Sequence, residues 1–213
     1  MMENRIHPWE GIYAREGYVF TEPISGFGSI AERFANHECG QVLDLGCGNG
    51  RHLLALKRQN FDVTGLDISP SGLHLAREWL RREGLQASLV CSDVRRPFPF
   101  PEGTFRGLIS TQVIHHALLV EVRRAIREIW DVLSEGGIAF VTVPGQKDKD
   151  VAYREIEPGT FIPLDGPERG LAHHFFSEEE LRQEFALFKI EEIGLRDRGK
   201  VIAMWVKKLA GGT

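Results

Sequence analysis

The sequence has little cysteine, no excess of positive charge and no long apolar run. Its three cysteines, Cys39, Cys47 and Cys91, are odd in number and widely spaced, so they indicate neither a disulfide framework nor a paired-cysteine zinc site. No apolar run approaches the roughly 18 residues of a membrane span. The start, MMENRIHPWEG, lacks the basic and then apolar segments of a signal peptide. We therefore expect a cytoplasmic protein without a membrane partner.

The charge balance argues against a nucleic-acid partner. The chain has 26 Lys and Arg against 30 Asp and Glu, a formal net charge of −4. Non-specific binding to nucleic acid usually draws on an excess of basic side chains. The pairs Arg81-Arg82, Arg95-Arg96 and Arg123-Arg124 are expected on solvated faces, although Arg81-Arg82 and Arg123-Arg124 would form the docking surface of an RNA or protein substrate.

Apolar runs alternate with helical periodicity through the first two thirds of the 213 residues. Strands are expected at Gln41–Leu45, Phe61–Asp67, Ala87–Cys91, Thr104–Ser110 and Ile138–Val143. Helices are expected at Arg51–Asn60, at Pro70–Gly84 with Ser69 as N-cap, and over Leu119–Leu133, ending at Gly136-Gly137. Strands separated by helices at this spacing predict βαβ units and a parallel sheet covered by helices on both faces.

The last third has a different composition. Residues 144–176 hold four of the ten prolines, which predicts a long loop or insertion, and loops of this length usually serve a function. A helix capped by Ser177 follows to Phe185. The segments Leu187–Leu195 and Val201–Lys207 flank a polar turn and predict an antiparallel hairpin.

A glycine-rich turn follows the first strand, in the run Asp44-Leu45-Gly46-Cys47-Gly48-Asn49-Gly50. Glycines there allow a sharp turn and let a ligand approach the main chain. A dinucleotide fingerprint needs a third glycine where this chain has Arg51, and a P-loop needs a Gly-Lys-Ser/Thr ending that is missing. The pattern favours a ligand that has a nucleoside and lacks a phosphate.

Acidic residues end the next two strands. Asp67 stands where a carboxylate accepts both hydrogens of a ribose diol. Asp93 follows the third strand, where it would accept from an exocyclic amine such as that of adenine, with Ile68 and Val94 on the two faces of the ring. The glycine turn and two such acids together make a fairly specific nucleoside site.

These residues resemble the class I S-adenosylmethionine-dependent methyltransferases from about Gln41 to Val143, with supporting topology to Lys207. The family's Leu-x-x-Gly-Gly turn before strand five matches residues 133–137. The stretch Ile109–His116 is similar to the small-molecule branch, the ubiquinone-biosynthesis and tellurite-resistance-like enzymes. Phe105-Arg106 departs from the Phe-Asp that this branch often has, which weakens the branch assignment more than the class.

The resemblance implies S-adenosylmethionine as cofactor and S-adenosylhomocysteine as product. The glycine turn would hold the methionine part, with Asp44 on its amino group, Asp67 on the ribose and Asp93 on the adenine amine. The cofactor-binding residues expected are Asp44, Gly46, Cys47, Gly48, Asp67, Ile68, Asp93, Val94 and Gln112.

The implied fold is a doubly wound, mostly parallel seven-stranded α/β sheet with a C-terminal antiparallel hairpin. A single methyltransferase domain would span residues 1–213. Within it, residues 1–38 form an N-terminal lid or helix region, and the loop insertion 145–176 lies on the acceptor side. The aromatic Trp9, Tyr13, Tyr18 and Phe20 either form a lid over the cofactor or cover the edge of the sheet.

The sulfonium methyl is already activated, so transfer is an in-line displacement that depends on alignment. A general base is needed only where the acceptor holds its proton. His115, His116 and His173 are the candidates, with His174 beside them, and a structural hydrogen bond is the competing interpretation for each pair. No Cys or acidic residue lies at ligand spacing, so no metal is expected.

We therefore expect an S-adenosylmethionine-dependent methyltransferase that acts on a small molecule. Tyr153, Arg154, Arg169 and His173 are the first polar residues to test for acceptor recognition. Two alternatives stay open: an RNA or protein methyltransferase, and a noncatalytic S-adenosylmethionine-binding module or partner subunit. A nicotinamide oxidoreductase is disfavoured by Arg51.

Overall fold

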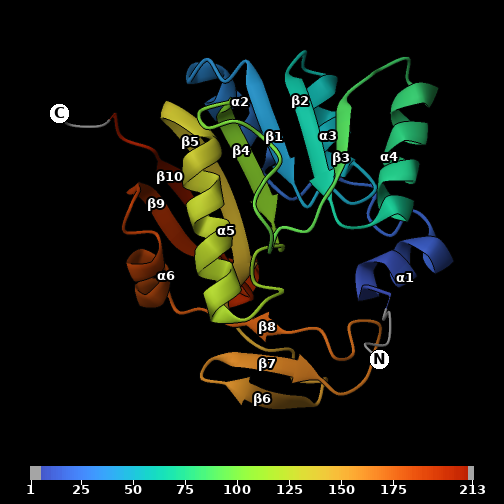
Figure 1. Cartoon of the computed structure of the whole chain (residues 1–213), viewed down its shortest axis with the longest axis vertical. Helices are drawn as coiled ribbons and strands as arrows, with labels where there is room; N and C mark the ends of the chain where they lie inside the picture. Colours follow the sequence, from blue (N-terminus) through green and yellow to red (C-terminus); the bar gives the residue numbers. More distant parts are fainter. Residues whose placement is uncertain (1–5, 211–213) are drawn as a thin grey trace.

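A seven-stranded sheet forms the centre of the molecule in the computed structural model, which describes residues 6–210 (Figure 1). Of the chain start, where no signal peptide was expected, residues 1–5 lie outside this range. The strand order is β3-β2-β1-β4-β5-β10-β9. The strands are β1 Gln41–Leu45, β2 Asp62–Asp67, β3 Ser88–Cys91, β4 Phe105–Thr111, β5 Leu133–Pro144, β9 Lys189–Arg196 and β10 Val201–Lys207. Strands β1 to β5 run parallel, and β10 is antiparallel to both β5 and β9, which confirms the predicted fold class.

Two apolar cores lie on the two faces of this sheet because successive strand residues point to opposite sides. Leu43 and Leu45 of β1 belong to one core, which packs under α5 (Leu119–Val132) and α6 (Glu178–Glu184). Val42 belongs to the other core. That second core is covered by α2 (Phe27–Asn36), α3 (Arg51–Lys57) and α4 (Pro70–Arg82). The sheet is therefore doubly wound, as predicted.

The predicted helix starts are confirmed by their caps. The Oγ of Ser69 accepts from the N–H of Gly72 over 2.9 Å at the start of α4. The Oγ of Ser177 accepts from the N–H of Glu180 over 3.1 Å at the start of α6. Each bond satisfies a donor that has no partner inside the helix. Helix α5 ends at Val132, earlier than Gly136-Gly137, and β5 begins at once.

The insertion is a small sheet, so the expectation of an irregular loop was wrong. Strands β6 (Tyr153–Glu157), β7 (Thr160–Pro163) and β8 (His173–His174) pair antiparallel in that order. Pro158 and Gly159 make the turn between β6 and β7, with Gly159 at φ +77°. Of the prolines and glycines that suggested a loop, Pro158 and Gly159 thus form a hairpin turn. This sheet lies beyond the carboxyl ends of the parallel strands, below them in Figure 1.

Helix α1 (Pro8–Glu16) lies near the same end of the sheet (Figure 1). Glu10 fixes it there, because its carboxylate accepts from Ser69 Oγ over 2.5 Å, Ser71 Oγ over 2.7 Å and the Ser71 N–H over 3.0 Å. Among residues 6–210, no helix combines the length and the apolar character needed to cross a membrane.

Candidate functional site

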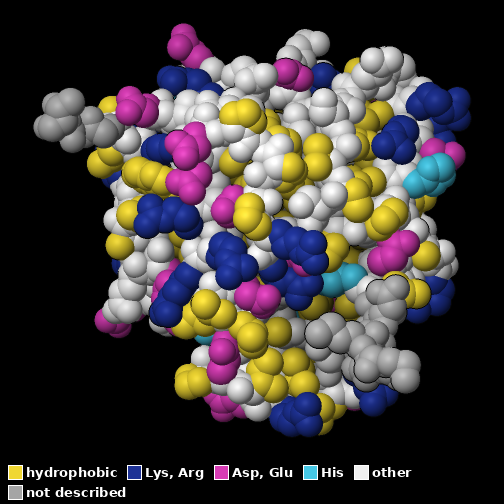
Figure 2. Space-filling model, viewed as in Figure 1, with side chains coloured by type: hydrophobic (Ala, Val, Ile, Leu, Met, Phe, Trp, Pro, Cys, Tyr) yellow, Lys and Arg dark blue, Asp and Glu magenta, His cyan; other side chains and the backbone are white. Residues whose placement is uncertain are grey.

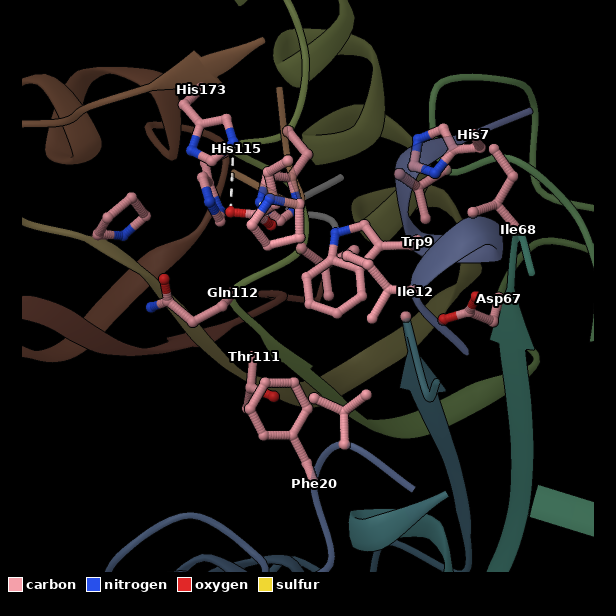
Figure 3. Close-up of a pocket in the computed structure, with 18 of the residues that line it drawn as sticks. His7, Trp9, Ile12, Phe20, Asp67, Ile68, Thr111, Gln112, His115 and His173 are labelled. Atoms are coloured by element: carbon pink, nitrogen blue, oxygen red, sulfur yellow. Dashed lines mark ion pairs between the residues drawn. The ribbon is translucent and has the colours of Figure 1, made fainter. Parts of the chain in front are cut away.

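A cavity of about 600 Å³ opens at the carboxyl ends of the parallel strands, between α1 and the insertion. Ligands of open α/β sheets bind at this end. The predicted site residues that line it are Gly46, Cys47, Asp67, Ile68, Asp93, Val94, Gln112, His115, His116 and His173. Figure 3 shows His115 and His173 on one side and Asp67 and Ile68 on the other, with Trp9 and Ile12 between them. The predicted residues Asp44 and Gly48 do not line the cavity.

The turn after β1 requires its glycines. Gly46, Gly48 and Gly50 have φ of +75°, +52° and +89°. A Cβ at Gly46 would lie 2.2 Å from a methyl of Val113, and one at Gly48 would lie 2.1 Å from the Tyr13 hydroxyl. Both positions therefore exclude a side chain by conformation and by space.

The main-chain amides of this turn bond within the protein. The N–H groups of Gly46 and Cys47 both donate to the Leu66 carbonyl, over 2.7 and 3.0 Å. Gly48 donates to Asp67 over 2.8 Å and Gly50 to the Cys47 carbonyl over 2.8 Å. These N–H groups of the turn are therefore not free to donate to a ligand. What the glycines present is main chain without side chains.

Asp67 ends β2 at the cavity wall and is 7% exposed. One carboxylate oxygen accepts from the N–H of Gly48 and the other from the N–H of Ser69, each over 2.8 Å. Burial raises the pKa of Asp67, and these bonds partly offset that rise. Each oxygen has a second lone pair, so the carboxylate retains two acceptor positions for a diol.

Asp93 has a partner that the sequence analysis missed. Arg95, two residues on, donates through Nε and Nη2 to its carboxylate, the shortest bond being 2.7 Å. Burial acts to raise the pKa of Asp93, but the bonds from Arg95 outweigh it and the pKa is lowered. Arg95 lines the cavity as well, so the adenine end presents an ion pair rather than a lone carboxylate.

Asp44 is buried beside the turn, at 2% exposure. Its Oδ2 has no hydrogen-bond partner among the residues that the structure describes. Burial raises its pKa to about 7, against the opposing charge of Arg51. An unpaired buried carboxylate oxygen is costly, so this atom is suited to a cationic partner that a ligand brings.

Three of the four N-terminal aromatic residues line the cavity: Trp9, Tyr13 and Phe20. The Trp9 ring lies 5.7 Å from Tyr13, 6.2 Å from Phe20 and 6.0 Å from His116, centre to centre. Tyr18 instead packs on Trp79 of α4 and donates to the Leu75 carbonyl. Three of the four residues therefore lie where the lid prediction places them, at the cavity, and Tyr18 packs on a helix.

The histidines separate into two groups. The rings of His115, His116 and His173 gather at the acceptor end, with centres 3.8 to 5.5 Å apart. Burial lowers the pKa of His115 well below its usual value and that of His173 to about 4, so both rings are neutral at pH 7. His174 points elsewhere: its Nδ1 lies 2.7 Å from Thr160 Oγ1 and its Nε2 3.0 Å from Glu180. The structural interpretation fits His174.

Residues 42–137 match the family model described as a methyltransferase domain. The 18S rRNA (guanine-N(7))-methyltransferase bud23 of Schizosaccharomyces pombe is 38% identical over 77 residues, 36% of this chain and 28% of that protein. The 2-heptyl-1-hydroxyquinolin-4(1H)-one methyltransferase of Mycobacteroides abscessus is 27% identical over 82% of this chain and 68% of that protein. The Burkholderia thailandensis 1,6-didemethyltoxoflavin-N1-methyltransferase, solved with its substrate and S-adenosylhomocysteine, superposes with a TM-score of 0.68 at 19% identity, over 94% of this chain and 85% of that one.

Residues 42–137 therefore match a methyltransferase domain, and the chain shares its fold with solved S-adenosylmethionine-dependent methyltransferases. The cavity fits the cofactor on two observations. Asp67 retains acceptor positions at the cavity wall, and Asp44 has an unpaired oxygen beside the turn. The resemblance did not lead us to expect the inward-bonded amides, the Asp93–Arg95 pair, or the absence of Asp44 and Gly48 from the cavity wall.

Sequence reasoning missed several residues of this methyltransferase cavity, including His7, Arg95, Gln146 and Glu168. Glu168 is the most informative of them. It lies in the insertion, 52 residues (168 − 116) after His116, and its Oε1 is 3.4 Å from His116 Nε2. Nothing in the local sequence marks this carboxylate, because only the folded insertion brings it to the histidines.

Proposed function

We propose that this chain moves a methyl group from S-adenosylmethionine to a small-molecule acceptor by in-line displacement. The observation that carries the proposal is a single cavity that reaches from Asp67 to His173, with α1 and the insertion in its wall. Its volume of about 600 Å³ falls within the range of small-ligand pockets, about 300 to 1,000 Å³. Donor and acceptor ends therefore share one space.

Bound S-adenosylmethionine supplies a sulfonium-activated methyl group. On this proposal, Asp67 accepts the ribose hydroxyls, Ile68 and Val94 contact the adenine, and the Asp93–Arg95 pair faces its amine edge. Gly46 and Cys47 of the turn line the methionine end, with the predicted Asp44 and Gly48 buried outside the cavity wall. These residues bind and orient the donor, which is the main requirement of a displacement.

Gln112 would stand at the junction between donor and acceptor. It follows β4 and lies in the cavity wall with a left-handed backbone, φ +58°. Its N–H donates to the Thr142 carbonyl over 3.0 Å, and this bond holds the conformation. Strained backbone of this kind concentrates at functional sites in proteins, which supports its assignment to the site.

His115, His116 and His173 form the acceptor end. Where the acceptor is a hydroxyl or an amine, a neutral imidazole there accepts its proton as the new bond to carbon forms and the bond to sulfur breaks. The apolar side chains Trp9, Tyr153 and Phe175 line the same cavity and suit a flat or aromatic acceptor. The names of the Mycobacteroides and Burkholderia relatives both specify heteroaromatic small molecules, which also supports this acceptor class.

The surface gives less support to an RNA acceptor. Arg95 is paired with Asp93, and Arg123 with Glu184, each over 2.7 Å. In Figure 2, acidic side chains lie beside the basic ones on this face. Paired arginines release fewer counterions on binding RNA. The likeness to the rRNA methyltransferase nonetheless makes RNA the acceptor to test against.

The test is methyl transfer by the full chain from S-adenosylmethionine labelled in the methyl group. The acceptor pools are hydroxylated and nitrogen heteroaromatic compounds, total RNA, and mixed protein. We expect tight S-adenosylhomocysteine binding by calorimetry and label in the small-molecule pool. Label in RNA or protein alone overturns the small-molecule acceptor. Binding without transfer to any pool indicates the noncatalytic module, and tight NADH binding without S-adenosylhomocysteine binding overturns the proposal entirely.

A further inference from the structure

We propose that His115, His116, His173 and Glu168 form a divalent transition-metal site of the zinc class at the acceptor end of the cavity. This inference rests on the proposed function, because it assigns the acceptor a way of binding. It also revises the expectation of no metal, which considered only ligand spacing along the sequence. The acidic partner that was missing there comes from the insertion.

The donor atoms of the three histidines already converge. One ring nitrogen from each lies within 4.8 Å of the others. A tetrahedral zinc site with Zn–N bonds of about 2.0–2.1 Å needs nitrogens roughly 3.3 Å apart. Small rotations of the three imidazole rings would bring the nitrogens from within 4.8 Å of one another to this spacing. Neutral imidazole is the form that binds a metal, and imidazole suits zinc, copper, iron and nickel.

The ring nitrogens of this cluster lack the partners expected of a structural histidine. His115 is 3% exposed and His173 5%. Neither His115 Nδ1 nor His173 Nε2 has a hydrogen bond within the described part of the chain. The neighbouring His174 shows what a structural role looks like here, because both its nitrogens are paired, with Thr160 and Glu180. The unpaired nitrogens of the cluster point to a ligand instead.

Glu168 brings the negative charge that a divalent ion requires. Its two carboxylate oxygens lie 3.4 Å from His116 Nε2 and 3.7 Å from His173 Nε2. It therefore lies beside the rings of His116 and His173. In this arrangement Glu168 serves as the fourth ligand or orients the two rings, and either role strengthens metal binding.

The backbone holds the cluster together before any ion binds. The N–H of His174 donates to the carbonyl of His115 over 2.8 Å, which ties β8 to the segment after β4. His173 pairs with Phe161 in β7. The three histidines thus come from β8 and the segment bonded to it, so little ordering of them is needed on binding, whereas Glu168 lies in the turn between β7 and β8.

The position of the site defines the acceptor class. All four residues line the cavity that also contains Gln112, so an ion held by them faces the transferred methyl. Catalytic metal sites keep one position open for a substrate atom. The acceptor expected is a molecule with a metal-binding hydroxyl, thiol or nitrogen. Imidazoles that bind the ion do not act as the general base, so the ion takes over that role. It lowers the pKa of the acceptor group, the proton passes to solvent, and the freed electron pair forms the bond to the methyl carbon while the carbon–sulfur bond breaks.

The experiment is titration of the tag-free, metal-stripped full chain with Co²⁺, followed by its visible absorption bands and by competition with Zn²⁺. We expect one ion per chain and the spectrum of a four- or five-coordinate ion. His116→Ala and His173→Ala should abolish this spectrum, and Glu168→Gln should weaken binding about 10- to 100-fold. His74→Ala is the matched control, since His74 is 67% exposed and lies on α4, and it should leave binding unchanged. Circular dichroism checks that each variant folds.

Acetohydroxamate, a bidentate oxygen ligand, then probes the open position. A shift of the cobalt spectrum supports an ion that faces the cavity, and no shift overturns its role in acceptor binding. Absence of binding at micromolar Co²⁺ or Zn²⁺, or binding unchanged in both His116→Ala and His173→Ala, overturns the metal site. Calorimetry with S-adenosylhomocysteine separates the two proposals. Cofactor binding without metal binding removes only this inference, and metal binding without cofactor binding removes only the proposed function.

Discussion

The Asp67 carboxylate accepts the main-chain N–H of Gly48 over 2.8 Å. The acid at the end of β2 therefore holds the turn after β1, and the two strands are neighbours in the sheet. This bond links the proposed ribose-binding position to the shape of the turn proposed to hold the methionine part. A change at either residue is expected to affect both halves of the cofactor site.

Asp67→Ala is predicted to weaken S-adenosylhomocysteine binding by roughly 2–4 kcal/mol, because two charge-assisted hydrogen bonds to the ribose are lost. Isothermal calorimetry measures the change. Asp62→Ala is the matched control, since Asp62 is an exposed acid at the other end of β2. Equal affinity in Asp67→Ala and Asp62→Ala would contradict the assignment of the ribose site.

Gly48→Ala is predicted to destabilise the fold by about 1–3 kcal/mol, since the new Cβ meets Tyr13 at 2.1 Å in a left-handed backbone. Urea denaturation gives the free energy of unfolding. Gly28→Ala on α2 is the control: its Cβ meets nothing within 4 Å, and alanine favours a helix by up to about 1 kcal/mol. A Gly48→Ala protein as stable as wild type would show that Tyr13 of α1 does not pack tightly against the turn.

Glu10→Ala is predicted to release α1 from the start of α4, because three hydrogen bonds from Ser69 and Ser71 end at this carboxylate. Hydrogen exchange of the α1 amides should quicken, and cofactor affinity should fall as Trp9 and Tyr13 lose their fixed position. Glu32→Ala, an exposed acid on α2, serves as the control. Unchanged exchange in α1 would mean that apolar contacts alone hold the helix.

Stability is predicted to decline as pH falls from about 6.5, in part because of His52. Burial lowers the pKa of His52 to about 3, and its Nε2 accepts from the N–H of Ile24 over 3.2 Å. Between pH 6.5 and about pH 3, the His52 ring binds a proton in the unfolded chain but not in the folded chain. The free energy of unfolding therefore falls by up to about 1.4 kcal/mol per pH unit from this group.

His52→Gln tests that contribution, since the amide oxygen of glutamine can accept from Ile24 and does not titrate. Urea denaturation from pH 6.5 down to pH 4.5 should show a shallower slope for the variant by about one proton. His74→Gln, at an exposed position of α4, should leave the slope as it is in wild type. Identical slopes for His52→Gln and wild type would refute the prediction.

Much of the fold was predictable because its signals are local. Ser69 and Ser177 cap helices within three residues of themselves, and β1 and β2 are short apolar runs that end in Gly46 and Asp67. A βαβ order leaves few topologies to choose from, since parallel strands need crossover connections of one hand. The number of strands, seven, was implied by the family resemblance, and the strand order came from the structure.

The insertion could not be predicted in the same way. Its strands are two to five residues long, and they pair through turns whose prolines and glycines are equally typical of loops. The pairing of Asp93 with Arg95 was also missed, although it spans only two residues, because the sequence does not tell whether an acid faces a ligand or its neighbour.

The sequence by itself determined the parallel sheet, the glycine turn and the acids at the strand ends, because each depends on short-range periodicity and backbone conformation. Only the tertiary structure decided that α1 lines the cavity, that Asp44 is buried with an unpaired oxygen, and that Glu168 meets His116 and His173. These contacts join segments far apart along the chain. They form only when the sheet brings its strand ends to one edge, and no local pattern specifies which distant side chain will lie there.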